Sequence, residues 1–164
     1  MSASASASVQ RVAAALAAHG PGDRIVELSQ TARSAEDAAS ACGVPVGAIV
    51  KSLLFVIDGE PVLALIAGDR RCDLAALPVA LGRTGTARRC EAEKVRAVTG
   101  FAIGGVAPIG HLSPLPTAID ASLARFPRLY AAAGHPHCVF ATSLPELRAL
   151  TGGTVTALIA PPTD

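Results

Sequence analysis

The sequence contains very few aromatic residues. Four Phe, one Tyr and no Trp among 164 residues leave almost no side chains on which bases could stack, which argues against RNA-binding sheets of the RRM or OB type. No apolar run reaches the roughly 18 to 20 residues of a membrane span. The N-terminal MSASASAS has neither the basic start nor the apolar core of a secretory signal. We therefore expect a cytoplasmic protein that does not associate with membranes.

The sequence also lacks closely paired cysteines and a strong net charge. Its four cysteines are widely spaced, which favours reduced thiols over a disulfide framework; they are Cys42, Cys72, Cys90 and Cys138. The net charge of +1 is too small to indicate a broad nucleic-acid surface. Basic residues do gather in the middle third, which fits either a solvated face or a local phosphate patch. They are Arg70, Arg71, Arg83, Arg88, Arg89, Lys94 and Arg96.

What is present indicates one folded domain. With 51% hydrophobic and 16% charged residues over 164 positions, the chain is long enough for one core and short for two. We predict a flexible tail over residues 1–8 and a single domain over residues 9–164.

Local patterns predict interspersed helices and strands. Apolar spacing indicates a helix from Val9 through Leu16 with Gly20 as its C-cap, and capping boxes begin helices after Ser34 and Ser143. Further helices are predicted over 73–80 and 91–98. Strands are predicted over 24–28, over 52–69 as a hairpin turning at Asp58-Gly59, and over 101–106, 116–120, 128–134, 137–142 and 154–160. Hairpins without a regular βαβ order predict an α+β (mixed α/β) fold with a central, largely antiparallel or mixed sheet flanked by helices.

Lysine is rare in this chain. Of 14 basic residues, only Lys51 and Lys94 are lysine. Lys51 stands at the mouth of the apolar segment AIVKSLLF (48–55), where a surface charge has little reason to be. Its ammonium group either reaches solvent along the strand or is a point charge directed at a phosphate or carbonyl oxygen in a cleft.

The segment GGVAPIGH (104–111) combines three glycines with a proline between apolar segments. It lacks the spacing of a nucleotide P-loop. Because glycine has no Cβ, its backbone N–H groups can approach a ligand closely, and two such donors stabilise the oxyanion of an acyl-transfer reaction. The alternative is a turn between two strands, with His111 as an ordinary loop residue.

The segment AAAGHPHC (131–138) brings His135, His137 and Cys138 together in sequence. These residues fit a metal site, a pocket-lining histidine or an exposed loop, but no HExxH or CxxC motif accompanies them. The sequence also has no GxSxG elbow, and no cysteine has a histidine at a family-type spacing. A hydrolase with this sequence would therefore work without a covalent intermediate.

Three segments in this order resemble the YbaK and prolyl-tRNA-synthetase-associated editing domain family. They are IVKSLLF (49–55), GGVAPIG (104–110) followed by LPTAID (115–120), and LYAAAGHP (129–136). The resemblance covers roughly Ile25 to Gly152. It implies a YbaK-like fold and hydrolysis of the ester that joins a wrong amino acid to tRNA. The implied substrate is proline tRNA carrying cysteine, alanine or a similar small residue, with prolyl-tRNA synthetase as a candidate partner.

The resemblance also implies roles for particular residues. Lys51 would hold the terminal nucleotide or the ester, and the loop from Gly104 through Gly105 to Pro108 would present backbone amides to the substrate carbonyl. The ribose hydroxyl of the substrate would activate the water, and no cofactor or metal is implied. The candidate catalytic residues are Lys51, Gly104 and Gly105, and the candidate substrate-binding residues are Ser52, Pro108, Gly134 and His135.

Three positions depart from the family pattern. Cysteine-clearing relatives usually carry Lys-Thr and alanine-clearing relatives Lys-Asn where this chain has Lys51-Ser52, so Ser52 favours the first group. His135-Pro136 instead resembles the alanine type, and Val139 stands where cysteine-type members place an acid. Two alternatives therefore remain: a non-catalytic binding module of the same fold, and a small-molecule hydrolase or metalloenzyme that uses His135, His137 and Cys138.

Overall fold

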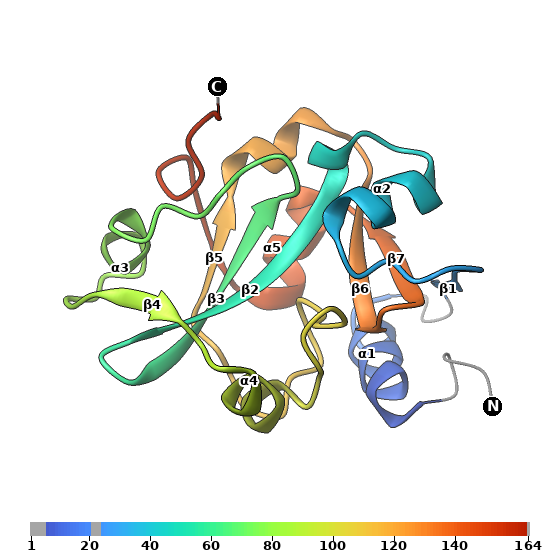
Figure 1. The fold of residues 1–164 in the computed structure, drawn as a ribbon, viewed down its shortest axis with the longest axis horizontal. Helices are drawn as coiled ribbons and strands as arrows, with labels where there is room; N and C mark the ends of the chain where they lie inside the picture. The colour runs from blue at the N-terminus through green and yellow to red at the C-terminus, as the bar shows by residue number, and fades with distance from the viewer. Residues whose placement is uncertain (1–5, 21–23, 164) are drawn as a thin grey trace.

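We describe a computed structural model in which residues 6–20 and 24–163 are placed. An eight-stranded sheet has the order β1-β7-β6-β2-β3-β5-β8, and β4 pairs with β2 off this path (Figure 1). The strands are β1 Ile25–Glu27, β2 Ile49–Ile57, β3 Glu60–Ala67, β4 Ala87–Arg89, β5 Thr117–Asp120, β6 Leu129–His135, β7 Cys138–Thr142 and β8 Thr154–Thr156. The helices are α1 Ala7–Ala17, α2 Ala35–Cys42, α3 Ala76–Ala80, α4 Ala92–Thr99 and α5 Leu144–Thr151, with short 3₁₀ helices η2 Val46–Ala48 and η3 Ala121–Arg125.

The sheet mixes parallel and antiparallel pairs. β1–β7, β6–β7, β2–β3 and β2–β4 are antiparallel, whereas β2–β6, β3–β5 and β5–β8 are parallel. The predicted mixed α/β class is confirmed, although the sheet is more evenly mixed than the hairpin pattern alone indicated. No helix among the described residues is long and apolar enough to cross a membrane.

Helices cover both faces of β6. Successive side chains of a strand point to opposite faces of its sheet. Leu129 and Ala131 belong to the same buried cluster as the α1 residues Val9 and Leu16. Tyr130, between them, packs instead with the buried alanines of α2. α1 and α2 therefore lie on opposite sides of this strand.

The two capping boxes and the hairpin turn are confirmed. The Ser34 hydroxyl accepts the N–H of Asp37 at 3.0 Å, and the Ser143 hydroxyl accepts the N–H of Glu146 at 3.3 Å. At the β2–β3 turn, Asp58 and Gly59 have φ values of 50° and 82°, as a type I′ turn requires at both central positions. All four cysteines are free thiols.

Several boundaries differ from the sequence prediction; α3 begins at Ala76 instead of residue 73, and β2 begins at Ile49 instead of residue 52. α1 ends at Ala17 with Ala18 as its C-cap, so the prediction of Gly20 is wrong. The helix also includes Ala7 and Ser8, which were assigned to the tail; residues 1–5 of that tail lie outside the described residues. The predicted final strand is confirmed only over Thr154–Thr156.

The segment 101–106 forms a loop, so the predicted strand there is wrong. α4 ends at Gly100 in the left-handed conformation. The N–H of Gly105 then donates to the carbonyl oxygen of Ala102 at 3.0 Å, which closes a turn. The apolar residues of this segment indicated a strand. The turn, however, uses the N–H of Gly105, which a strand would need for pairing with its neighbour.

Candidate active site

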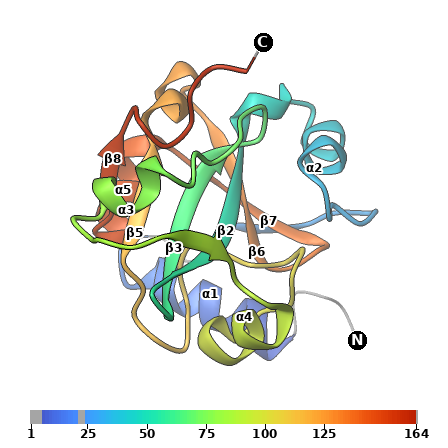
Figure 2. The same ribbon diagram turned by 60° about the vertical axis from the view of Figure 1, so that its left-hand side comes forward.

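A cavity opens where the sheet splits beside β2. β6 pairs with β2 only at Ile49 and Val50, and β4 pairs with it only from Phe55 onward. Residues 51–54 therefore have a strand neighbour on the β3 side alone. Figure 1 shows β2 and β6 diverging, and Figure 2 shows β4 against the far end of β2. The cavity has a volume of about 400 Å³ and is lined by residues of β2, β6, β7, α2, β4 and the loop after α4.

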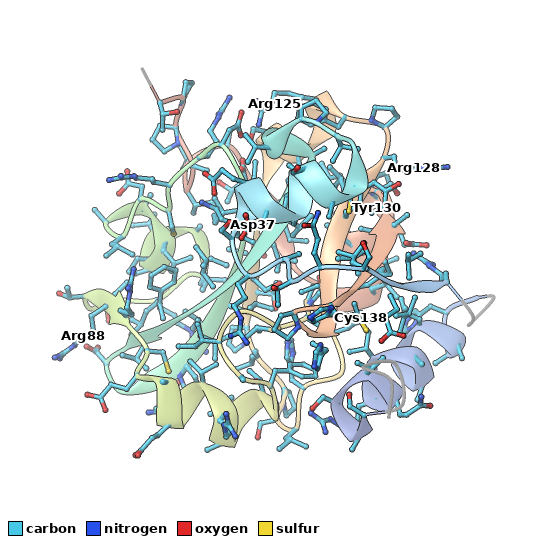
Figure 3. The ribbon with its side chains drawn as sticks, turned by 45° about the vertical axis from the view of Figure 1, so that its right-hand side comes forward. Asp37, Arg88, Arg125, Arg128, Tyr130 and Cys138 are labelled. Atoms are coloured by element: carbon cyan, nitrogen blue, oxygen red, sulfur yellow. The ribbon has the colours of Figure 1, made fainter. Side chains whose placement is uncertain are left out.

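Four of the predicted site residues meet at this cavity. Lys51 and Ser52 come from β2, Gly104 from the loop after α4, and His135 from the end of β6. The β6–β7 hairpin forms the wall opposite β2, and Figure 3 shows Tyr130 and Cys138 at its two ends. Three segments far apart in the sequence thus contribute to one site.

The structure does not bring the other three predicted residues into the lining. Pro108 lines a second cavity of about 430 Å³ beside α1 and α5. A Cβ on Gly134 (φ 96°) would lie 2.9 Å from the carbonyl oxygen of Ser8, so this glycine permits the close approach of α1. A Cβ on Gly105 would lie 3.1 Å from the His135 backbone. Gly105 and Gly134 therefore serve backbone packing.

The backbone donors at the loop differ from those expected. The N–H of Gly105 is already bonded to Ala102, so it is not free to receive a carbonyl oxygen. Gly104 and Val106 both line the cavity, and within the described residues neither N–H donates a hydrogen bond. Val106 was missed because an apolar residue gives no sequence signal for the use of its main chain.

Lys51 is half-buried at the cavity wall. Its Nζ donates to the carbonyl oxygen of Arg70 at 2.5 Å. Burial lowers the pKa of its ammonium group, and the charge of Glu36 acts in the opposite direction. The charge thus lies where solvation is poor, which is the condition under which an ammonium group interacts strongly with an incoming anion or carbonyl oxygen.

His135 is held in one tautomer. Its Nδ1 accepts the N–H of His137 at 3.0 Å, so the ring hydrogen of the neutral imidazole is on Nε2. The His137 ring lies 5.5 Å from that of His135, and its Nδ1 is 3.3 Å from the carbonyl oxygen of Leu28. The described residues contain no group of three His, Cys, Asp or Glu side chains that could hold a metal ion. The local geometry makes His135 a hydrogen-bond donor through Nε2.

Two exposed arginines stand at the cavity. Arg33, which precedes the N-cap of α2, and Arg89, at the end of β4, both line it. Neither takes part in the ion pairs of the described residues, which are Arg24–Glu146, Arg83–Glu60 and Arg125–Asp69. Arg33 was missed because it lies outside the basic cluster in the sequence. An unneutralised guanidinium is well suited to phosphate.

Three of the seven residues of the basic cluster have internal partners. Arg83 pairs with Glu60, Lys94 donates to the Gly59 carbonyl oxygen at 2.9 Å, and Arg70 donates to the Ala160 carbonyl oxygen at 3.0 Å. Only Arg89 of the cluster lines the cavity. At the cavity itself, the candidates for binding phosphate among the described arginines are therefore Arg33 and Arg89.

Arg11 of α1 holds the loop after α4 in position. Arg11 Nε donates to the carbonyl oxygen of Gly110 at 3.3 Å, and its guanidinium lies 5.0 Å from the centre of the Phe101 ring. His111 Nε2 lies 2.7 Å from the carbonyl oxygen of Ala107, and its burial lowers the pKa of the imidazole. His111, expected to be an ordinary loop residue, thus positions the segment that contains Gly104.

The thiols at the cavity are poor nucleophiles. Cys90 and Cys138 line it, and burial raises the pKa of both. The thiolate is the reactive form of cysteine, so neither side chain is prepared for covalent catalysis. The cavity therefore offers an ammonium group, backbone N–H groups and an imidazole N–H in mainly apolar surroundings.

Comparison with known proteins places this arrangement in a family. The chain is 41% identical to the proline–tRNA ligase of Oleidesulfovibrio alaskensis over 75 residues, which is 46% of this chain but only 13% of the ligase. The uncharacterized protein YwhH of Bacillus subtilis is 32% identical over 111 residues, covering 67% of this chain and 69% of that protein. A crystal structure assigned as a candidate trans-editing enzyme for prolyl tRNA synthetase superposes with a TM-score of 0.86 at 42% identity, covering 96% of this chain and 99% of the other.

Residues 29–150 match the aminoacyl-tRNA editing domain family. This range includes the split sheet, Lys51, the loop after α4 and the β6–β7 hairpin. The cavity described above lies within it. The chain belongs to the aminoacyl-tRNA editing domain family.

Proposed function

We propose that this protein is an aminoacyl-tRNA deacylase that acts in trans in the cytoplasm on mischarged proline tRNA. The observation that carries the proposal is the convergence of Lys51, Gly104 and His135 from three segments on one cavity. The likeness to the candidate trans-editing structure supports the choice of proline tRNA, and prolyl-tRNA synthetase is the proposed partner.

The reaction needs little from the protein. Water adds to the ester carbonyl carbon, the bond from that carbon to the ribose oxygen breaks, and the ribose oxygen takes the proton that the water loses. The neighbouring ribose hydroxyl of the substrate relays this proton. The Gly104 and Val106 N–H groups receive the developing oxyanion, and Lys51 anchors the substrate beside it. One oxyanion donor contributes about 3 to 4 kcal/mol, and positioning of the reactants contributes roughly 7 to 11 kcal/mol.

The amino acid removed is proposed to be small: alanine, cysteine or a similar residue. The walls near the catalytic groups are apolar, and Val139 and Cys138 contribute to them. An apolar pocket distinguishes one methylene by only about 1 to 3 kcal/mol. We therefore expect activity on several small residues with graded rates.

A deacylation panel tests the proposal. Purified protein is incubated with alanyl-, cysteinyl- and aminobutyryl-tRNA(Pro), with prolyl-tRNA(Pro) as the matched control, and ester loss is compared with buffer. The proposal expects turnover on at least one mischarged tRNA and much slower loss of proline. Tight binding of an aminoacyl-adenosine analogue without turnover on any substrate would instead establish a non-catalytic binding module.

A further inference from the structure

The backbone of Ser52 faces the split in the sheet. The Ile49 carbonyl oxygen accepts the N–H of Gly68 at 2.8 Å, which places the polar backbone groups of Ile49 on the β3 side. The Leu54 carbonyl oxygen accepts the N–H of Cys90 at 3.2 Å, on the opposite side. Since the backbone groups of successive strand residues alternate in direction, Ser52 presents its N–H and C=O on the same side as Leu54.

On that side Ser52 has no strand partner. The ladder between β2 and β6 ends at the pair Val50–Ala131, so the next bond of a parallel ladder, from the Ser52 N–H to the Ala132 carbonyl oxygen, is not made. β6 is irregular between Ala132 and His135, as expected where a bulge bends a strand away. Within the described residues, the printed strand registers therefore give Ser52 no partner on this side.

These main-chain groups, and not the side chain, are what Ser52 can offer a ligand. Ser52 lines the cavity, but its hydroxyl oxygen is buried and has no hydrogen-bond partner. Its contact with the cavity therefore comes from its other atoms, of which only the main-chain N–H and C=O are polar. The Ser52 N–H is a donor and its C=O an acceptor, and the two lie side by side. They match a ligand edge that carries an acceptor next to a donor.

We propose that the Ser52 main chain reads the adenine of the terminal adenosine of tRNA. The Ser52 N–H donates to an adenine ring nitrogen, and the adenine amino group donates to the Ser52 carbonyl oxygen. RNA-binding proteins commonly read unstacked bases through such edges. Ile103, which is 57% exposed and lines the cavity, gives the base an aliphatic contact. This inference rests on the proposed function, which supplies the terminal adenosine.

The binding test uses nucleotides and backbone amide NMR. Adenosine 5′-monophosphate is titrated into ¹⁵N-labelled protein, with inosine 5′-monophosphate and purine riboside 5′-monophosphate as matched probes. Both lack the amino group, and inosine also carries a hydrogen on the ring nitrogen beside it. We expect a saturable shift of the Ser52 N–H with the adenine nucleotide and at least about tenfold weaker binding of the other two. Ser52→Ala keeps the main chain, so it should retain this preference. No saturable shift at Ser52, or equal affinity for the three nucleotides, overturns the proposal.

The kinetic test uses tRNA whose terminal adenosine is replaced by inosine and which carries the same amino acid. The proposal expects kcat/KM to fall about tenfold or more, whereas equal rates on both tRNAs contradict it and leave the deacylase function intact. Loss of turnover on every substrate, with the Ser52 response to adenosine 5′-monophosphate retained, contradicts the deacylase function alone.

Discussion

The N–H of Gly105 donates to the carbonyl oxygen of Ala102 at 3.0 Å, and this bond separates the roles of the two adjacent glycines. Gly104 lines the cavity with its N–H unpaired among the described residues, whereas Gly105 packs against the His135 backbone. The first is therefore our proposed catalytic donor, whereas the second fixes the position of the loop.

Gly105→Ala should destabilise the fold. The added Cβ would lie 3.1 Å from backbone atoms of His135, which cannot move aside as a flexible side chain can. Overpacking of this kind costs about 1 to 3 kcal/mol. Denaturant unfolding of Gly105→Ala and wild type in parallel measures the change. Equal stability of Gly105→Ala and wild type would show that the loop is not packed in this way.

Ser52→Ala should leave stability unchanged or raise it by about 1 kcal/mol. The Ser52 hydroxyl oxygen is buried without a partner, and such a group costs about 1 to 3 kcal/mol of desolvation. Thermal unfolding of the two proteins in parallel measures the difference. A clear loss of stability in Ser52→Ala would indicate that the hydroxyl has a structural partner.

Activity that needs the charge on Lys51 should fall at lower pH than for an ordinary lysine. Burial lowers the pKa of this group from 10.5, so the ammonium form is lost as pH rises through the lowered value. The measurement is kcat/KM against pH, corrected for the faster buffer hydrolysis at alkaline pH. Lys51→Met should remove this alkaline limb together with most of the rate. A wild-type profile that stays flat up to pH 10.5 would show that the Lys51 charge is not used.

Glu146→Gln should lower stability at neutral pH and matter less in acid. Hydrogen bonds from Arg24 hold the pKa of the Glu146 carboxyl below its usual value, and the Thr142 hydroxyl adds to this. The carboxylate form therefore stabilises the fold above the unfolded pKa of about 4.3, and this contribution disappears as pH falls through the lowered value. With side-chain exposures of 26% and 35%, solvent screening limits the effect to about 1 kcal/mol or less. A gap between wild type and variant that persists at pH 2 would contradict this reading.

The sequence predicted those elements whose signals are local. Capping boxes at Ser34 and Ser143 and the Asp58-Gly59 turn are decided by neighbouring residues, and each was confirmed. The segment 101–106 was wrongly predicted as a strand. Its apolar residues Phe101 and Val106 belong to a loop that packs into the hydrophobic core, where Phe101 is completely buried. That outcome depends on contacts with α1, which no short pattern contains.

The site was predictable only as far as side-chain identity and family resemblance reach. Lys51 is one of two lysines and Gly104 belongs to a glycine-rich segment, so both could be singled out from the sequence. Both line the cavity. Val106 and the Ser52 main chain could not be found in this way, because an unpaired N–H follows from where β2 and β6 separate. Arg33 was missed because its approach to Gly104 depends on the path of the chain before α2.

The central claim is that the Lys51 ammonium at the cavity is needed to cleave the ester, and the two lysines of the chain allow a matched test. Single-turnover deacylation of alanyl-tRNA(Pro) is compared for wild type, Lys51→Ala and Lys94→Ala, with folding of each checked by circular dichroism. Lys94 donates to the Gly59 carbonyl oxygen at the β2–β3 turn and is not among the residues that line the cavity, so its variant should keep the wild-type rate, while Lys51→Ala should lose at least about a hundredfold. A folded Lys51→Ala protein that deacylates as fast as Lys94→Ala would contradict the account.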